Sequence, residues 1–173
     1  MRTQDDLFSN EASSIALDTS FATAKRIALD RVSWVEVVPG WMSASRILFD
    51  RLTTAVPWKQ HDRRLFDQTF REPRLTAEYR ALRNAPERAL TDAAAALSTH
   101  YGVVYDSLWL NLYRDGQDST GWHRDRFSCR RPHCIVPVLT VPKEPGIAER
   151  RISINFQSSM QAGWSMSTTR KNQ

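Results

Sequence analysis

The residues with the clearest capacity for chemistry are His123 and Asp125, in the segment Trp122-His123-Arg124-Asp125. At the end of a strand, side chains two residues apart point to the same face, so this imidazole and this carboxylate can bind one metal ion. They supply two of the three ligands of the facial triad that holds non-haem Fe(II) and leaves coordination positions open. An isolated His-x-Asp is most often a surface pair, so the interpretation depends on the surrounding sequence.

The surrounding sequence contains two further motifs. Residues 111–125 read Asn-Leu-Tyr, then Arg-Asp-Gly, and end in Trp-His-Arg-Asp, while residues 151–156 read Arg-Ile-Ser-Ile-Asn-Phe. Both segments resemble the signature of the AlkB family of Fe(II)- and 2-oxoglutarate-dependent dioxygenases. That signature consists of Asn-x-Tyr, an Asp-Gly turn, Trp-His-x-Asp and a closing strand that begins with Arg. Residues 73–77 are similar to a family segment near the nucleotide-recognition lid.

The resemblance implies roles for individual residues. His123 and Asp125 would be iron ligands, and Trp122 would pack beside the metal. Arg151 would form a salt bridge with the far carboxylate of 2-oxoglutarate, because a planar guanidinium binds a carboxylate with two parallel hydrogen bonds. The other residues of the cosubstrate pocket would be Asn111, Tyr113 and Ser153.

The resemblance also implies a reaction, namely oxidative demethylation of alkylated bases in DNA or RNA with Fe(II), 2-oxoglutarate and O2. The damaged base would be flipped into the pocket to reach the iron. Arginines alternate with aromatic residues in the region expected to form the lid, which suits phosphate contact and base stacking. The candidate substrate-binding residues are Trp58, His61, Arg71, Arg74, Tyr79 and Trp122. The alternative for each lid residue is a solvated surface position.

One expected ligand is missing from the sequence. The family has a second histidine between the positions of Asp125 and Arg151, but the only histidine there is His133. The flanking family-like segments join directly at Thr140–Val141, which indicates the loss of an internal segment. His133 is one candidate substitute ligand. A zinc site is another alternative, although its spacing fits no standard zinc pattern, and it would use His123, Cys129, His133 and Cys134.

This gap leaves two functional hypotheses of different classes. The first is an AlkB-type dioxygenase, and the second is a catalytically impaired AlkB-like remnant that only binds nucleic acid. Gln157 is a smaller departure, because many family members have a second arginine there. The net charge of +5 and the isoelectric point near 9.6 favour a polyanionic partner under either hypothesis.

Size and composition predict a single domain. The chain has 173 residues and two cysteines, which are too few for a disulfide framework. No signal peptide and no membrane-spanning stretch is recognisable, so we expect a cytoplasmic monomer with no membrane partner. The expected divisions are an N-terminal extension (1–30), helices with the nucleotide-recognition region (31–100), a jelly-roll catalytic part (101–157) and a polar tail (158–173).

The residue pattern predicts an α+β fold with N-terminal helices and an incomplete jelly-roll core, also called a double-stranded β-helix. Helices are expected at 21–29, capped by residues 18–20, at 41–55, and from Pro86-Glu87 to about His100. Strands are expected at 32–38, 103–105, 108–113, 134–141 and 150–157. The order of the elements is therefore helices first and strands later.

Overall fold

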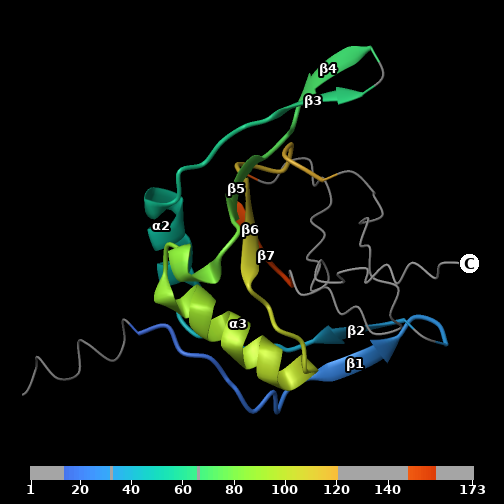
Figure 1. Ribbon diagram of the computed structural model, residues 1–173, viewed down its shortest axis with the longest axis vertical. Coiled ribbons are helices and arrows are strands. Elements are labelled where there is room, and N and C mark those ends of the chain that lie inside the picture. The colour runs from blue at the N-terminus through green and yellow to red at the C-terminus, as the bar shows by residue number, and fades with distance from the viewer. Residues whose placement is uncertain (1–13, 32, 66, 121–147, 159–173) are drawn as a thin grey trace, which may run out of the picture.

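The structure is a computed structural model, and it describes residues 14–31, 33–65, 67–120 and 148–158. At its centre lies a three-stranded antiparallel sheet in the order β5–β6–β7, formed by Leu75–Tyr79, Ser107–Tyr113 and Arg151–Gln157. Helices α2 (Ser45–Ala55) and α3 (Arg88–Tyr101) lie on one side of this sheet (Figure 1). A short 3-10 helix, η1 (Leu82–Asn84), connects β5 to α3.

Two hairpins lie at opposite ends of the molecule (Figure 1). One pairs β1 (Lys25–Ala28) with β2 (Trp34–Val37). The other pairs β3 (Asp62–Leu65) with β4 (Gln68–Arg71) and extends away from the central sheet. This mixed fold of helices and antiparallel strands is compatible with part of a jelly roll, and the described residues form no closed barrel.

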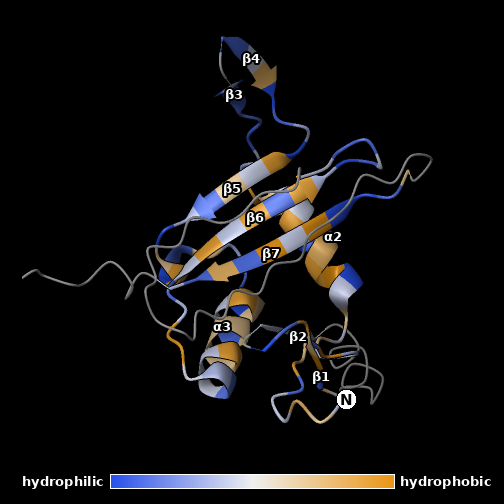
Figure 2. Cartoon of the chain, turned by 90° about the vertical axis from the view of Figure 1, so that its right-hand side faces the viewer, coloured by the Kyte–Doolittle hydropathy of each residue, from blue (hydrophilic) through white to orange (hydrophobic). Residues whose placement is uncertain are grey.

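The hydrophobic core lies between the two helices and the sheet. The helices bury leucine and alanine side chains, notably Leu52 and Leu90. The sheet contributes Leu108, Leu110 and Phe156, which are at most 5% exposed. These positions alternate with polar ones along β6 and β7, and the alternation is visible as changing colour along each strand (Figure 2). Period-two alternation therefore divides the sheet into a helix-covered face and a polar face.

Both long helices were predicted from the sequence and are confirmed. α2 begins at Ser45, four residues later than expected, and ends at Ala55, two residues before Pro57. α3 ends at Tyr101, and the following residue, Gly102, has a φ of +65°, a left-handed conformation that glycine adopts without steric cost. The predicted strands at 32–38, 108–113 and 150–157 correspond to β2, β6 and β7. Residues 103–105 form no strand, and the strand predicted at 134–141 lies outside the described residues.

The predicted helix at 21–29 is wrong. The Asp18 carboxylate accepts a hydrogen bond from the Ser20 backbone at 3.0 Å and forms a turn instead of a helix cap. Phe21 then adopts a φ of +52° and stacks on the ring of His100 at 3.8 Å. From Lys25 onward the chain pairs with β2, so tertiary contacts override the local helical pattern. The predicted order, with helices before strands, is also wrong, because β1 to β5 precede α3.

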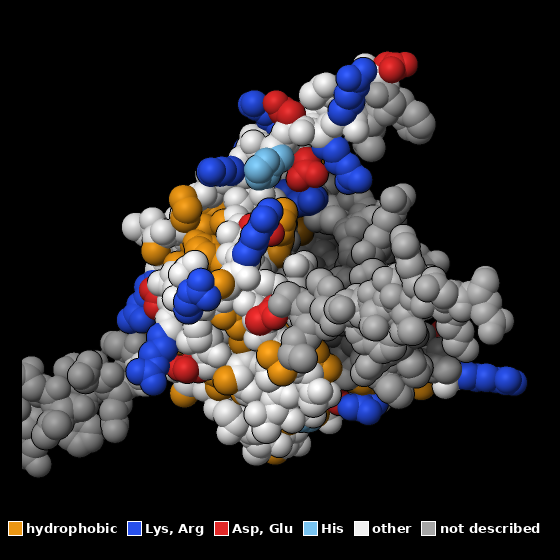
Figure 3. Space-filling model, in the orientation of Figure 1, with side chains coloured by type: hydrophobic (Ala, Val, Ile, Leu, Met, Phe, Trp, Pro, Cys, Tyr) orange, Lys and Arg blue, Asp and Glu red, His pale blue; other side chains and the backbone are white. Residues whose placement is uncertain are grey.

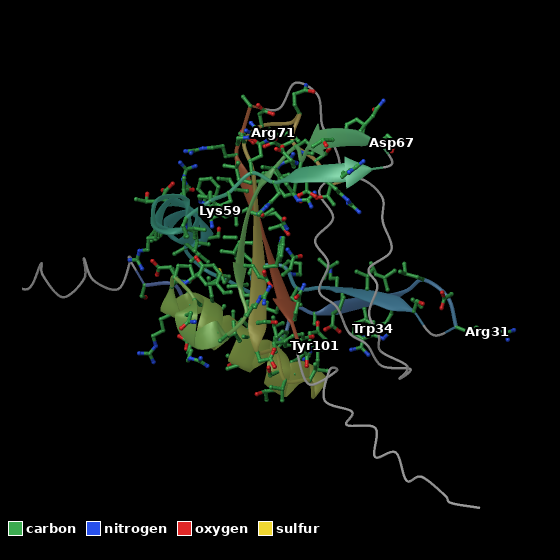
Figure 4. The ribbon with its side chains drawn as sticks, turned by 45° about the horizontal axis from the view of Figure 1, so that its top comes forward. Arg31, Trp34, Lys59, Asp67, Arg71 and Tyr101 are labelled. Atoms are coloured by element: carbon green, nitrogen blue, oxygen red, sulfur yellow. The ribbon has the colours of Figure 1, made fainter. Side chains whose placement is uncertain are left out.

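A buried carboxylate fixes the β1–β2 hairpin to the end of α3. Glu36 Oε1 accepts hydrogen bonds from the Tyr101 hydroxyl and from His100, each at 2.9 Å. Arg26 binds the other carboxylate oxygen at 3.1 Å and stacks on Trp34. Burial raises the pKa of Glu36, but these hydrogen bonds outweigh it and hold the pKa below its ordinary value. The labelled Trp34 and Tyr101 mark this junction in Figure 4.

Candidate functional site

The four predicted cosubstrate residues lie together on the polar face of the sheet. In the β6–β7 register, Asn111 is paired with Ser153, and Tyr113 is paired with Arg151. Directly opposed side chains of an antiparallel pair lie on the same face, with Cβ atoms about 5 Å apart. The two cross-strand pairs are neighbours on that face, because their members are two residues apart on each strand. The structure thus brings together all four of these residues.

The polar face contains three of the buried polar side chains found among the described residues. Thr76, Asn111 and Ser153 are 2%, 8% and 1% exposed, and they form a single row across β5, β6 and β7. Buried polar groups are costly unless they are hydrogen-bonded, so a row of them in a small sheet calls for an explanation. Within the described part of the chain, the Thr76 hydroxyl has no hydrogen-bond partner.

Neighbouring side chains orient this row. Trp109 donates a hydrogen bond from its indole Nε1 to Asn111 Oδ1 at 3.0 Å. That bond fixes the amide, so its Nδ2 group remains as the donor. On β7, Asn155 donates from Nδ2 to the Ser153 hydroxyl at 3.2 Å and to the Trp109 carbonyl oxygen at 3.2 Å. The face therefore presents hydrogen-bond donors held in defined orientations.

The hydrogen bonds of Tyr113 reach residues outside β6. The Tyr113 side chain is 1% exposed, and its hydroxyl lies 2.8 Å from the Thr120 hydroxyl. Arg74 directly precedes β5 and donates from Nη1 to the same Thr120 oxygen at 3.1 Å. Arg74 is also paired with Glu72 at 3.3 Å. Because Arg151 stands opposite Tyr113 on β7, Tyr113 lies between Arg151 on one side and Arg74, which directly precedes β5, on the other.

An internal ion pair closes the turn after β6. Arg114 binds Asp118 through Nε at 2.7 Å and through Nη2 at 2.9 Å, and its backbone N–H donates to the same carboxylate. The hydrogen bond from the Arg114 side chain is the main reason why the pKa of Asp118 lies below its ordinary value, and burial opposes it. The Ser119 N–H also donates a hydrogen bond to the Pro73 carbonyl oxygen. Together, these contacts place Thr120 beside the polar face.

We expect Asp118→Asn to lower the free energy of unfolding by about 1–2 kcal/mol at pH 7, because it removes a charge-assisted hydrogen-bonded pair whose arginine is partly exposed. The pKa of Asp118 is lowered on folding, so its stabilisation is present above the unfolded pKa. It is lost as the pH falls through the lowered folded value. Urea unfolding at several pH values measures this effect. Asp50→Asn, in an exposed pair of the same spacing with Arg46, is the control and should change stability little.

The predicted metal site lies outside the described residues. Trp122, His123 and Asp125 follow Thr120 by two, three and five positions, and all three fall in 121–147. The alternative ligands Cys129, His133 and Cys134 fall in the same range. Within the described ranges, no three His, Cys, Asp or Glu side chains gather in a way that could hold a metal ion. Gln157 is exposed at the end of β7, opposite Ser107.

The five predicted lid residues that are described occupy different environments. His61 and Arg71 are exposed where the β3–β4 hairpin joins the body, and Arg71 is paired with Asp62 at 3.1 Å. Figure 4 shows Arg71 and Asp67 at opposite ends of β4. Arg74 donates a hydrogen bond to Thr120 beside the polar face. Trp58 and Tyr79 instead pack against the hydrophobic core, and Tyr79 lies on the helix-covered face of β5. The structure does not bring these two to the polar face.

Four residues that line the polar face or contact it were not predicted as site residues from the sequence, namely Thr76, Trp109, Thr120 and Asn155. Trp109 and Asn155 share the face of Asn111 and Ser153, and period-two counting along the predicted strands could have found them. Thr120 could not have been found in this way, because it reaches Tyr113 only through the turn closed by Arg114 and Asp118.

The chain is similar to AlkB-like dioxygenases, with moderate identity over about half of its length. The alpha-ketoglutarate-dependent dioxygenase alkB homolog 3 of Rattus norvegicus is 33% identical over 107 residues, which cover 54% of this chain and 36% of that protein. The homologues of the same name from Homo sapiens and Bos taurus are each 32% identical over 107 residues. Alpha-ketoglutarate is another name for 2-oxoglutarate.

These matches have a limited extent. The chain spans about a third of the length of the curated relatives it matches, with 36% and 37% of those proteins covered. No family model matches the chain. Among the described residues, no helix combines the length and apolar character required to cross a membrane.

Proposed function

We propose that the protein is an AlkB-type, Fe(II)- and 2-oxoglutarate-dependent dioxygenase that demethylates alkylated bases in DNA or RNA. The observation that carries this proposal is the pairing of Asn111 with Ser153 and of Tyr113 with Arg151 on one face of the sheet. Two sequence motifs that are 40 residues apart at Asn111 and Arg151 thereby supply one set of side chains. The similarity to the alkB homolog 3 proteins supports the same class of enzyme.

The polar face suits a ligand with carboxylate groups. Arg151 would hold the far carboxylate of 2-oxoglutarate through paired hydrogen bonds, and the Tyr113 hydroxyl would donate to the same group. The Asn111 amide is oriented by Trp109 so that its Nδ2 can donate to the cosubstrate. The buried Thr76 hydroxyl, which has no hydrogen-bond partner within the described residues, adds a polar group that a bound molecule would satisfy.

The iron would be held by His123 and Asp125, which follow the Tyr113–Thr120 contact in the chain. When bound, the metal and 2-oxoglutarate together supply the oxidation by O2 that hydroxylates the methyl group of the damaged base. The residues of this chain bind the cosubstrate and position the base near the metal. His133 is the histidine available between Asp125 and Arg151 as a further ligand.

The β3–β4 hairpin is the surface that we propose to contact the nucleic acid. Lys and Arg side chains lie along and beside it, with acidic side chains between them (Figure 3). Arg63 is exposed and stands opposite Phe70, which is 49% exposed, so a cation and an aromatic ring are adjacent on one hairpin. Phosphate binding by arginine and stacking by an aromatic ring are the two contacts that single-stranded nucleic acids require.

Release of formaldehyde and succinate from methylated single-stranded DNA tests the proposal. We expect turnover with Fe(II), ascorbate and 2-oxoglutarate, and we expect its loss in His123→Ala, because that change removes a proposed metal ligand. Equal product from wild type and His123→Ala would contradict the proposal. Binding of 2-oxoglutarate and DNA without turnover would instead support a catalytically impaired remnant. Calorimetry with Mn(II) then separates an impaired metal site from one that binds no metal.

A further inference from the structure

The Thr120 hydroxyl connects the lid region with the cosubstrate face. It receives a hydrogen bond from Arg74 Nη1 at 3.1 Å and lies 2.8 Å from the Tyr113 hydroxyl. Arg74 and Thr120 are separated by 46 positions in the chain, so the contact depends on the fold. The Arg74 side chain is 17% exposed and Tyr113 is 1% exposed, which shields this chain of hydrogen bonds from water.

The chemistry of the three groups fixes the direction of the Arg74–Thr120 hydrogen bond and favours one direction for the Thr120–Tyr113 bond. A guanidinium can only donate, so the Thr120 oxygen is the acceptor of the Arg74 bond. Accepting a bond from a cation polarises the Thr120 O–H and makes it a stronger donor. Its second partner is the Tyr113 oxygen at 2.8 Å, and the polarised Thr120 O–H favours the arrangement in which Tyr113 accepts from Thr120. The Tyr113 O–H is then left to donate to a ligand on the polar face.

We propose that Thr120 is a positioning residue for 2-oxoglutarate, acting through Tyr113. With Arg74 and Thr120 in place, the Tyr113 hydroxyl is held as a donor beside Arg151, its cross-strand partner. A hydroxyl donor next to a guanidinium is a suitable pair for the two oxygens of one carboxylate. This inference rests on the proposed function, since it takes 2-oxoglutarate as the ligand of the polar face.

The affinity of the full-length protein for 2-oxoglutarate, measured by calorimetry in the presence of Mn(II), tests this role. We expect Thr120→Val to weaken binding about five-fold, as is typical for the loss of one hydrogen bond. Thr120→Ser keeps the hydroxyl and should bind like wild type. Thr53→Val is the matched control, because it removes a threonine hydroxyl that is bonded at 2.8 Å to the Phe49 carbonyl within α2.

A double-mutant cycle distinguishes positioning from general loosening of the fold. If Thr120 acts through the Tyr113 hydroxyl, Thr120→Val should have no further effect on affinity in a Tyr113→Phe background. Equal affinity of wild type and Thr120→Val would overturn the inference and leave the proposed function intact. Additive effects of the two changes would also overturn it. If the wild type shows no binding of 2-oxoglutarate, both the proposed function and the inference fail.

Discussion

An Arg151→Gln variant is expected to bind 2-oxoglutarate roughly a hundredfold more weakly than the wild type, because truncating one partner of a desolvated charge pair costs about 3 kcal/mol. Glutamine keeps much of the length of the side chain but loses the charge and the second parallel hydrogen bond. Arg151 lies opposite Tyr113, so the change removes one half of the proposed carboxylate-binding pair. Calorimetric titration with 2-oxoglutarate measures the difference.

Arg88→Gln provides the matched control for this change. Arg88 is in the first turn of α3, its side chain is 92% exposed, and its partner Asp92 is also exposed. The same loss of charge there should leave the affinity for 2-oxoglutarate unchanged. If both variants bind as the wild type does, the far carboxylate is held elsewhere and the role of Arg151 is disproved.

The largest loss of stability is expected for Leu110→Ala. Leu110 is 0% exposed at the centre of β6, where it is paired with Ala77 on β5 and Ile154 on β7. Removing its side chain leaves a cavity between the sheet and the helices, which should lower the free energy of unfolding by about 3 kcal/mol. Urea unfolding followed by circular dichroism measures this change.

A leucine on the surface provides the comparison for the core variant. Leu29 is 68% exposed, so Leu29→Ala should change the free energy of unfolding by less than about 0.5 kcal/mol. Similar losses in the two variants would mean that β6 does not form the centre of the core. In that case the division of the sheet into a polar and a helix-covered face would also be wrong.

The parts of the fold that were predictable are those with a local signal. β6 and β7 alternate between polar and apolar residues, and α3 ends at a glycine, so the sequence alone indicates both kinds of element. Strand β1 was missed, and the chain that leads into it is held by the stacking of Phe21 on His100, a residue 79 positions away. Such a contact has no local signature. The strands β3 and β4 were missed for a different reason, since their charged and polar residues resemble a solvated surface.

The candidate site also combines residues with a local sequence signal and residues that depend on long-range contacts. Its four predicted cosubstrate residues come from two motifs, and the register of β6 and β7 brings them to one face. Trp109 orients Asn111 through a hydrogen bond within β6, and Thr120 reaches Tyr113 only because of the turn between them. Motifs indicate candidate ligand-binding residues, whereas residues that orient other residues become visible only in three dimensions.

The cross-strand pairing also determines which changes in chain length the protein can tolerate. Because side chains alternate with a period of two, inserting one residue within β7 would move Arg151 or Ser153 to the helix-covered face. The number of residues between the two strands does not affect the face on which these side chains lie. Doubling the length of a connecting loop costs only about 0.6 kcal/mol. The proposed carboxylate-binding half of the site can therefore persist through insertions and deletions in the segment between β6 and β7.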